Sequence, residues 1–518
     1  MRRRTRFSAS VILCIGLILS LLGTGGQAAT ARLLVPGYDA TTTDSGAARR
    51  FEPATCPWKL PDGQVEGQTV TCGFAVVPEQ HANPTGPTIK LPVAVFKSAS
   101  ANPAPDPVVY IEGGPGGAVQ DTLTYLLARD LPTLTANRDL IVYDQRGVGF
   151  SQPNLACPEV TAQDLTDAQV ELSPDDKASH DIAAIAVCRY RLTKQGIALG
   201  AYTSAEGAAD LNDIRALLGY PQLDLLGVSY GTRVALTMMR DFPGAVRGAV
   251  LDSSVPLQAN LVEDDGTNFD RSFNLFFAAC AADTACNASA PTLQADYTAT
   301  VAQLNAQPIT TPVKDDKSGT TVPVVVDGYD LTSLIGEMFY DKTATSIIPQ
   351  LIAQVRRGDT RLLDLIIQAL GVTGPDINIG TYYSILCSEE VPFNSRDHAT
   401  AIVTALPPDL QPIFAVEVRE FFDVCAQWPV APVNSVETQA VTSAVPALVL
   451  SSDNDPATPP DYGKQVAQTL TKGYLVTFPG IGHSILSNGG DCGLSTMMSF
   501  INDPTQPPPT DCVPKKAG

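Results

Sequence analysis

Ser229 lies between two glycines in the segment GVSYG, which spans residues 227–231. The leucine-rich segment before it predicts a buried strand, and the segment after it, TRVALTMMRDF, predicts a helix. A serine placed this way between a strand and a helix is typical of a nucleophile elbow, a tight turn that exposes the hydroxyl. Glycine and serine are common in turns, so the spacing indicates catalysis only if the chain also supplies a base, an acid and an oxyanion hole.

A general base for this serine has to come from one of four histidines. His81 lies in a polar turn, His180 in an acidic stretch, and His398 in a segment with a helical pattern. Only His483 follows an apolar strand late in the chain, in the loop FPGIGHS. A fold with a serine elbow places its base in such a loop, so His483 is the predicted general base.

The acid that orients the base is expected at a strand end between Ser229 and His483. The segment ALVLSSDNDPATPP ends a strand and carries Asp453 and Asp455, with Asp461 slightly further along. We favour Asp455, because the proline after it stiffens the turn and fixes the direction of the carboxylate. The alternative for these aspartates is a purely structural role in capping the turn.

An oxyanion hole needs backbone N–H groups that point at the developing negative charge. One is expected from Tyr230, the residue after the nucleophile, and the other from a loop that follows an earlier strand. The glycine-rich segment EGGPGG, at residues 112–117, supplies such a loop, with Gly114 as the predicted donor. A phosphate-binding loop is the alternative, but no Gly-Lys-Ser/Thr sequence follows these glycines.

The segments around these residues alternate between strand and helix patterns. PDPVVYI, DLIVYD, LDLLG and RGAVLD predict buried strands, and SAEGAADLNDIRALLG predicts a helix between two of them. Such alternation indicates a parallel α/β sheet. Helical patterns replace it over residues 257–440, and strand patterns return afterwards. We therefore expect one sheet domain that carries a large helical insertion.

The chain begins with the three parts of a secretory signal peptide: the basic MRRRTRF, the apolar SASVILCIGLILSLLG and the small-residue TGGQAATA. Cleavage after Ala28, Ala29 or Ala31 fits this pattern. A membrane anchor is the alternative, but the apolar stretch is short for a span. Cys14 lies inside the apolar stretch, which argues against a lipoprotein. We expect an exported protein, secreted or periplasmic, without stable membrane insertion.

These patterns together predict the boundaries of the chain. They are a signal peptide at 1–29, a flexible lead-in at 30–50, the first part of the sheet domain at 51–256, the helical insertion at 257–440, the second part of the sheet domain at 441–512 and a tail at 513–518.

The formal net charge of the chain is −20. Removal of the signal peptide takes away four arginines and no acids, which leaves a mature chain at about −24. A chain this acidic does not fit nucleic acid or an anionic membrane as the main partner, and it mildly favours cationic substrates.

Ten of the eleven cysteines remain after removal of the signal peptide, an even number in an exported chain, which predicts disulfides. Closeness along the sequence suggests five pairs: Cys56–Cys72, Cys157–Cys188, Cys280–Cys286, Cys387–Cys425 and Cys492–Cys512. Zinc is the alternative use of cysteine, but the chain has no Cys-x-x-Cys pair. We therefore expect no metal and no other cofactor.

Five motifs, GGPGG, DQRGVGFS, GVSYGTR, DPATPP and GIGHS, occur in the order found in the serine aminopeptidase branch of the α/β-hydrolases. The chain resembles this family, and in particular its exported tripeptidyl aminopeptidase-like and proline iminopeptidase-like members. The resemblance implies an α/β-hydrolase fold, with a mostly parallel central sheet and flanking helices. It also implies the triad of Ser229, Asp455 and His483 and the oxyanion hole of Gly114 and Tyr230.

The resemblance further implies that the helical insertion forms a cap over the active site. Acids of this cap bind the free α-amine of the substrate in the iminopeptidases. The segment LCSEEVPF offers Glu389 and Glu390 for this role, because a carboxylate pair suits an ammonium group. The alternative is that these two residues form a solvated face.

The chain departs from the family pattern at two positions. Glu112 stands where many relatives have a histidine, and Tyr230 stands where the iminopeptidases usually have a tryptophan. Both departures weaken a strict specificity for proline. Asp144 and Arg146 in the DQRG segment are interpreted as structural residues that brace the oxyanion loop.

The predicted function is therefore that of an exported serine aminopeptidase, which releases N-terminal residues or short peptides through an acyl-enzyme. Its partners are peptide substrates with a free N-terminus, and a monomer is assumed. A carboxylesterase on the same triad is the first alternative, because one scaffold hosts many chemistries. A non-catalytic binding protein on a hydrolase scaffold is the second, and the intact triad argues against it.

Overall fold

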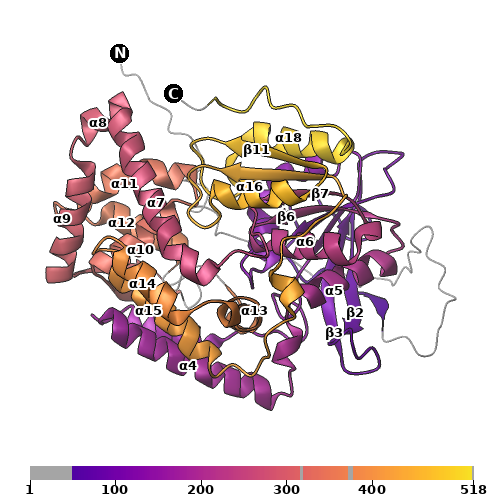
Figure 1. Cartoon of the computed structure of the whole chain (residues 1–518), viewed down its shortest axis with the longest axis horizontal. Helices are drawn as coiled ribbons and strands as arrows, with labels where there is room; N and C mark the ends of the chain where they lie inside the picture. Colours follow the sequence, from indigo (N-terminus) through magenta and orange to yellow (C-terminus); the bar gives the residue numbers. More distant parts are fainter. Residues whose placement is uncertain (1–48, 315–318, 372–376, 516–518) are drawn as a thin grey trace, which may run out of the picture.

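The computed structural model describes residues 49–314, 319–371 and 377–515 (Figure 1). Nine strands of these residues form one sheet. In spatial order they are β1 (Arg50–Pro53), β2 (Val70–Pro78), β3 (Thr88–Phe96), β5 (Leu140–Tyr143), β4 (Val108–Ile111), β6 (Leu223–Val228), β7 (Val246–Asp252), β10 (Ala447–Ser452) and β11 (Gly473–Phe478). The strands from β5 to β11 are parallel, while β1, β2 and β3 are antiparallel. The predicted mostly parallel sheet is thus confirmed.

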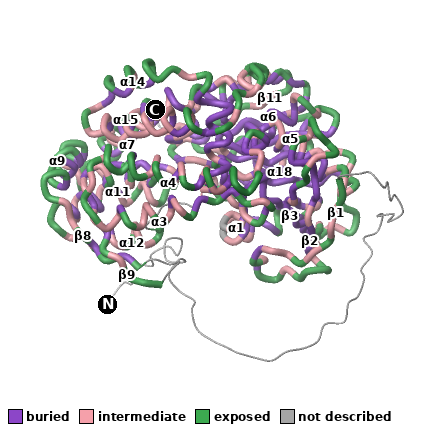
Figure 2. The backbone as a smooth tube through the Cα atoms, turned by 90° about the horizontal axis from the view of Figure 1, so that it is seen from below, coloured by how far each residue is buried: buried purple, intermediate pink, exposed green. Residues whose placement is uncertain are grey.

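Each face of the sheet has its own apolar core, because side chains of a strand alternate between faces. In β6, Leu225 packs on one face and Leu226 on the other. The first face is covered by α5 (Ser204–Leu217), α6 (Tyr230–Asp241) and α16 (Pro460–Thr469), and the second by α2 (Ala128–Leu134) and α18 (Gly490–Asn502). Figure 2 shows the buried backbone gathered in the part of the molecule that holds the sheet.

The helical insertion forms a lobe beside the sheet, the cap (Figure 1). Its helices are α7 (Leu261–Ala282), α8 (Thr284–Ser289), α9 (Leu293–Ala306), α10 (Gly328–Met338), α11 (Lys342–Val355), α12 (Arg361–Leu370), α13 (Ile379–Ile385), α14 (Arg396–Ala405) and α15 (Gln411–Cys425). An apolar core of its own holds most of them together.

The cap differs from the expected all-helical insertion in two ways. It contains an antiparallel hairpin of β8 (Ile309–Lys314) and β9 (Thr321–Val326), whose alternating side chains place Val313 and Val324 in the cap core. In addition, α3 (Pro158–Asp167) and α4 (Pro174–Lys194) precede the expected start at residue 257 but share an apolar cluster with α13 and α15. The helical layer is therefore built from two separate segments of the chain.

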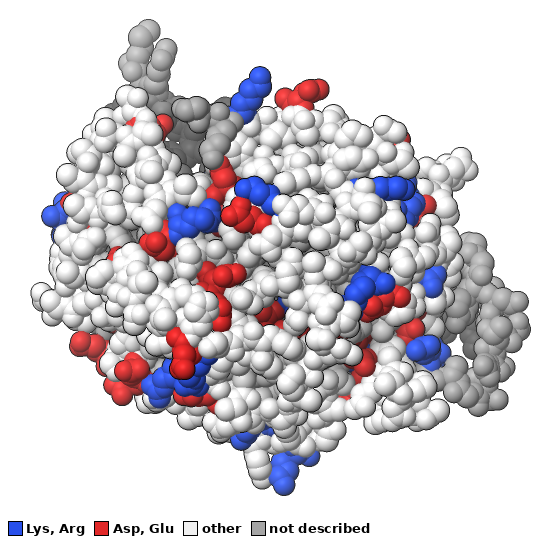
Figure 3. All heavy atoms as spheres, in the orientation of Figure 1, with Lys and Arg blue, Asp and Glu red and all other residues white. Residues whose placement is uncertain are grey.

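Disulfides join all five predicted cysteine pairs: Cys56–Cys72, Cys157–Cys188, Cys280–Cys286, Cys387–Cys425 and Cys492–Cys512. Disulfides of this number are typical of proteins that fold outside the cytoplasm. Among the described residues, no helix is both long and apolar enough to cross a membrane. The predicted signal peptide lies outside the described residues. The face of the molecule in Figure 3 carries interspersed acidic and basic side chains without an extended basic patch.

Candidate active site

Ser229 occupies the sharp turn between β6 and α6, with φ 56° and ψ −127°. A side chain at positive φ is strained, and such strain is typical of a nucleophile elbow. The flanking glycines are required by contact: a Cβ on Gly231 would lie 2.1 Å from the carbonyl oxygen of Ile111, and one on Gly227 would lie 2.7 Å from that of Gly231. The turn can therefore form only with glycine at both positions.

The structure brings His483 and Asp455 together at the carboxyl edge of the sheet, the edge where Ser229 also lies. Asp455 follows β10 and is fully buried, and its Oδ2 lies 2.9 Å from Nδ1 of His483. Thr458 holds the carboxylate in place, since its hydroxyl donates to Oδ2 over 2.6 Å and its amide donates to Oδ1 over 2.8 Å. This geometry leaves Nε2 of His483 as the ring nitrogen that can act as a base.

Asp455 and His483 each stabilise the charged form of the other. Burial alone would raise the pKa of Asp455, but the charge of His483 and hydrogen bonds from His483 and Thr458 bring it below its usual value. Burial alone would lower the pKa of His483, but the carboxylate of Asp455 raises it above the ordinary value of 6.5. Asp252 and Glu337 add to this increase.

The other three histidines are engaged elsewhere in the fold. His81 lies 3.1 Å from the carboxylate of Asp213, His180 lies 2.9 Å from that of Asp167, and His398 lies 2.7 Å from that of Glu263. Their placement fits the choice of His483 as the base. Among the described residues, no group of histidine, cysteine and acidic side chains could hold a metal ion.

The glycine-rich loop after β4 lies against the nucleophile. A Cβ on Gly113 would come within 3.0 Å of the Cβ of Ser229. Gly114 has φ +115°, and its amide has no hydrogen-bond acceptor within the described part of the chain. Tyr230 is the first residue of α6, and amides at that position have no acceptor within a helix. Both expected oxyanion donors are therefore free to bind a substrate oxygen.

The DQRG segment braces this loop through Asp144 and Gln145. The buried carboxylate of Asp144 accepts from the amide of Val119 over 3.0 Å, and the Gln145 side chain donates to the carbonyl oxygen of Glu112 over 2.8 Å. The expectation that Arg146 shares this role is wrong. Its guanidinium instead makes two 2.7 Å hydrogen bonds to Asp210 on α5, which ties that helix to the sheet.

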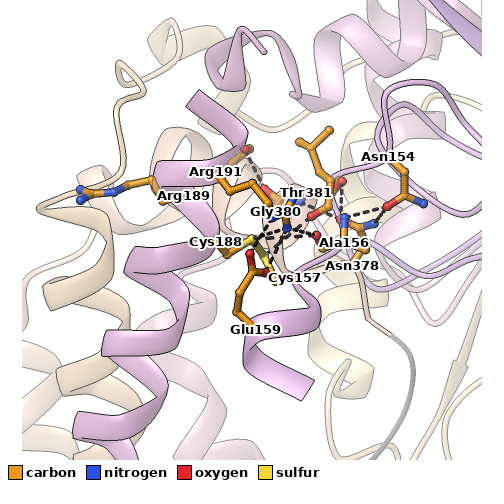
Figure 4. The surroundings of a disulfide bond; sticks show 12 residues. Asn154, Ala156, Cys157, Glu159, Cys188, Arg189, Arg191, Asn378, Gly380 and Thr381 are labelled. Atoms are coloured by element: carbon orange, nitrogen blue, oxygen red, sulfur yellow. Dashed lines mark hydrogen bonds and ion pairs between the residues drawn. A yellow bond between two sulfur atoms is a disulfide. The ribbon is translucent and has the colours of Figure 1, made fainter. Parts of the chain in front are cut away.

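The cap also contacts this loop through Asn378, just before α13. Its amide donates to the carbonyl oxygen of Gly116 over 2.9 Å, and its side chain donates to Oδ1 of Asn154 over 3.0 Å. Figure 4 shows that the Cys157–Cys188 disulfide lies beside this contact and joins the start of α3 to α4. The disulfide thus stabilises the segment on which Asn378 rests.

The cap further holds the loops that carry the acid and the base. Arg271 of α7 donates to the carbonyl oxygen of Asp453 over 2.7 Å and to that of Asp455. The carbonyl oxygen of Tyr340, after α10, accepts from the amide of His483 over 3.0 Å, and the two rings are 5.1 Å apart. Neither contact has a recognisable signal in the sequence, because the partners are far apart along the chain.

Glu389 and Glu390 lie in the cap, as expected, but each is already paired with a cation. Both are almost fully buried, with 2% and 3% of their surface exposed, and both bind the guanidinium of Arg233 in α6. Glu389 also accepts from the hydroxyl of Ser204 over 2.7 Å. Through these contacts with Arg233, the two carboxylates join the cap to α6, the helix that follows Ser229.

One acid in a different set of cap acids acts on His483. The carboxylate of Glu337, on α10, raises the pKa of His483. Burial and the neighbouring Asp265 carboxylate raise the pKa of Glu337 itself, and they raise that of Glu417, on α15, well above its usual value. Burial and repulsion favour the neutral form of these acids, and a positive charge placed beside them would favour their ionised form.

Glu337 and Glu417 line a cavity of about 680 Å³ within the cap. Its wall includes Ile379 and Tyr382 of α13, the helix that follows the Asn378 contact with the oxyanion loop. Most residues of this wall are apolar, but nine of its charged residues are acidic and only Lys177, among the described members, is basic. The charged residues of the cavity are therefore mainly acidic, Ile379 of its wall follows the residue that binds Gly116, and Glu337 of its wall raises the pKa of His483.

A family model described as the alpha/beta hydrolase fold matches residues 106–489, so this chain belongs to the α/β-hydrolase fold family. Its relatives are hydrolytic enzymes, and the chain is a serine hydrolase of this family. It is 26% identical to serine protease Hip1 of Mycobacterium tuberculosis over 89% of this chain and 92% of that one. These findings confirm the resemblance to the serine aminopeptidase branch.

Two further relatives differ in their described activities. Carboxylesterase B of Mycobacterium tuberculosis is 25% identical, with 98% of each chain covered. A tripeptidyl aminopeptidase of Streptomyces coelicolor is 26% identical over 82% of this chain and 78% of that one. Among solved structures, a proline iminopeptidase of Mycobacterium smegmatis has a TM-score of 0.39 at 14% identity and covers 83% of this chain and 98% of that one.

Proposed function

We propose that this protein is an exported serine aminopeptidase that releases N-terminal residues or short peptides. Ser229 attacks the substrate carbonyl, while His483 accepts its proton and passes it to the leaving amine. Asp455 orients the imidazole and stabilises its charged form, and the amides of Gly114 and Tyr230 bind the oxyanion. Water then hydrolyses the acyl-enzyme, with His483 acting again as the base.

The cavity of the cap, whose wall includes Glu337, is the observation that carries the aminopeptidase proposal. A peptide whose carbonyl carbon lies at Ser229 must place its free N-terminus a short distance away. Glu337 and Glu417 line the cavity and Glu337 raises the pKa of His483, whereas Glu389 and Glu390 are paired with Arg233. We therefore assign the ammonium-binding role to Glu337 and Glu417.

Two relatives support peptide substrates, since one is described as a serine protease and another as a tripeptidyl aminopeptidase. The relative described as a carboxylesterase supports the alternative, a carboxylesterase on the same triad. An esterase gains nothing from an acidic cavity, because its usual substrates carry no ammonium group. The cavity therefore favours the aminopeptidase.

The discriminating experiment compares matched substrates. A fluorogenic tripeptide amide and aminoacyl amides, proline included, are each tested with a free and an acetylated N-terminus, beside a p-nitrophenyl ester. We expect acetylation of the N-terminus to abolish amide cleavage. Equal cleavage of free and acetylated amides would overturn recognition of the free amine, and turnover of the ester alone would favour the esterase.

Export is proposed from the N-terminal sequence, and the five disulfides support it. Expression in a bacterial host followed by N-terminal sequencing of the secreted protein tests it. We expect a mature chain that starts after Ala28, Ala29 or Ala31. A protein that stays in the cytoplasm with residue 1 intact would overturn this part of the proposal.

A further inference from the structure

Asp252 is a fully buried carboxylate at the end of β7, next to the strand that leads into Ser229. Its side chain accepts three hydrogen bonds from the residues that follow His483. The amide of Ile485 donates to Oδ1 over 2.8 Å, the amide of Leu486 donates to Oδ2 over 2.8 Å, and the hydroxyl of Ser484 donates to Oδ2 over 3.1 Å. The carboxylate thus fixes the backbone directly after the base.

The main chain at the same position holds the nucleophile. The carbonyl oxygen of Asp252 accepts from the amide of Ser229 over 2.9 Å. The next residue, Ser253, accepts from the amide of Ser484 through its hydroxyl over 2.8 Å. Two consecutive residues therefore bind the nucleophile on one side and the loop of the base on the other.

This part of the backbone is under strain that these contacts counteract. Ser229, Ser253 and Ser484 are the non-glycine residues with positive φ in the described chain, at 56°, 56° and 67°. Such conformations persist only where the surrounding structure over-determines them. All three are linked through the hydrogen bonds of Asp252 and Ser253. The strain is thus concentrated where the nucleophile and the base must be placed relative to each other.

We propose that Asp252 is a positioning residue that sets the distance and orientation of His483 relative to Ser229. This inference rests on the catalytic roles proposed for those two residues, and it applies to acylation by any substrate, ester or amide. A displacement of about 1 Å between catalytic groups can lower a rate about 100-fold, so loss of these hydrogen bonds should act on kcat rather than on KM.

The charge of Asp252 adds an electrostatic consequence. His483 faces the carboxylates of Asp455, Asp252 and Glu337, and each of them raises the pKa of the imidazole. Tyr340 from the cap also lies against the ring. The replacement Asp252→Asn removes one of the three negative charges, so the pKa of His483 should decrease.

The test compares Asp252→Asn with Asp224→Asn. Asp224 is matched in burial, with 1% exposed, but it lies at the start of β6 and accepts from Arg247 over 2.9 Å, away from the catalytic edge. The measurements are the melting temperature, the rate of fluorophosphonate labelling of Ser229, and the pH profile of p-nitrophenyl ester hydrolysis.

We expect Asp252→Asn to lower kcat and the labelling rate about 100-fold at unchanged KM, and to move the acidic limb of the pH profile to lower pH. Asp224→Asn should lose stability only. Labelling and kcat close to wild type in Asp252→Asn would overturn the proposal, as would an unmoved acidic limb.

Two further measurements keep the outcome decisive. If Asp252→Asn does not fold, Ser253→Ala removes one hydrogen bond to Ser484 and should lower the labelling rate about tenfold, whereas a wild-type rate overturns the proposal. If the wild-type enzyme is not labelled at Ser229, the proposed function fails instead. The two failures are therefore distinguishable.

Discussion

At the level of single residues, the environment of His483 decides how the site depends on pH. Asp455 is the principal partner, with Asp252 and Glu337 as further carboxylates that raise the pKa of the imidazole above 6.5. Only the neutral ring can accept the proton of Ser229, and the ring becomes protonated as the pH falls through this pKa. Activity should therefore be present above the pKa of His483 and be lost below it.

We expect Glu337→Gln to move the acidic limb of the kcat/KM profile to lower pH, because it removes a charge that raises the pKa of His483. The ester substrate is used, so that loss of ammonium binding does not obscure the effect. Glu171→Gln changes another acid of the same cavity and serves as the control. An identical shift in both variants, or no shift in either, would contradict the assignment.

At the level of elements, the close contact between α6 and β4 explains the glycines of the elbow. Gly231 of α6 approaches the carbonyl oxygen of Ile111 so closely that a Cβ would lie only 2.1 Å away. Gly207 of α5 is also a helical glycine, but a Cβ there would first meet Val234 at 4.0 Å. The packing therefore requires glycine at position 231 but allows a small side chain at position 207.

We expect Gly231→Ala to cost about 3 kcal/mol of stability or more through the forced contact. Gly207→Ala should be neutral, or stabilising by up to about 1 kcal/mol, because alanine is the better helix former. Urea unfolding of both variants measures the difference. Similar free energies of unfolding would contradict the packing argument.

The position of a residue relative to its strand or helix decides whether its role could be predicted from the sequence. The residues of the proposed triad and oxyanion loop lie in or just after loops that follow strands, so their motifs could be recognised locally, and the disulfides join cysteines close in sequence. Asp252 and Arg271 act on loops about 180 residues or more away, which no local pattern encodes. The same reason explains why the ion pairs of Glu389 and Glu390 could not be predicted, because their partner Arg233 is 156 residues from Glu389.

At the level of the whole molecule, the cap binds three loops that carry proposed catalytic groups. It contacts the acid loop through Arg271, the base through Tyr340 and the oxyanion loop through Asn378. A cover that only excludes water would not need hydrogen bonds to all three. Disturbing these contacts should therefore change the chemical step, even with the cap still folded.

We expect Arg271→Ala to lower kcat about 10- to 100-fold, since the loop that carries Asp455 loses its anchor. Added guanidinium should restore part of the activity. Arg356→Ala is the control, because the partner of that arginine, Asp296, lies within the cap itself. Wild-type kcat in Arg271→Ala would show that the cap does not support the acid.

The most direct test of the account is the turnover of Ser229→Ala, together with the position of the fluorophosphonate label in the wild-type enzyme. We predict a label on Ser229 and a decrease in kcat of roughly 10⁴–10⁶-fold in the variant, as for other triad serines. Ser254→Ala, a buried serine at the same sheet edge, should retain normal turnover. Near-normal turnover of Ser229→Ala, or a label on another residue, would contradict the proposed mechanism.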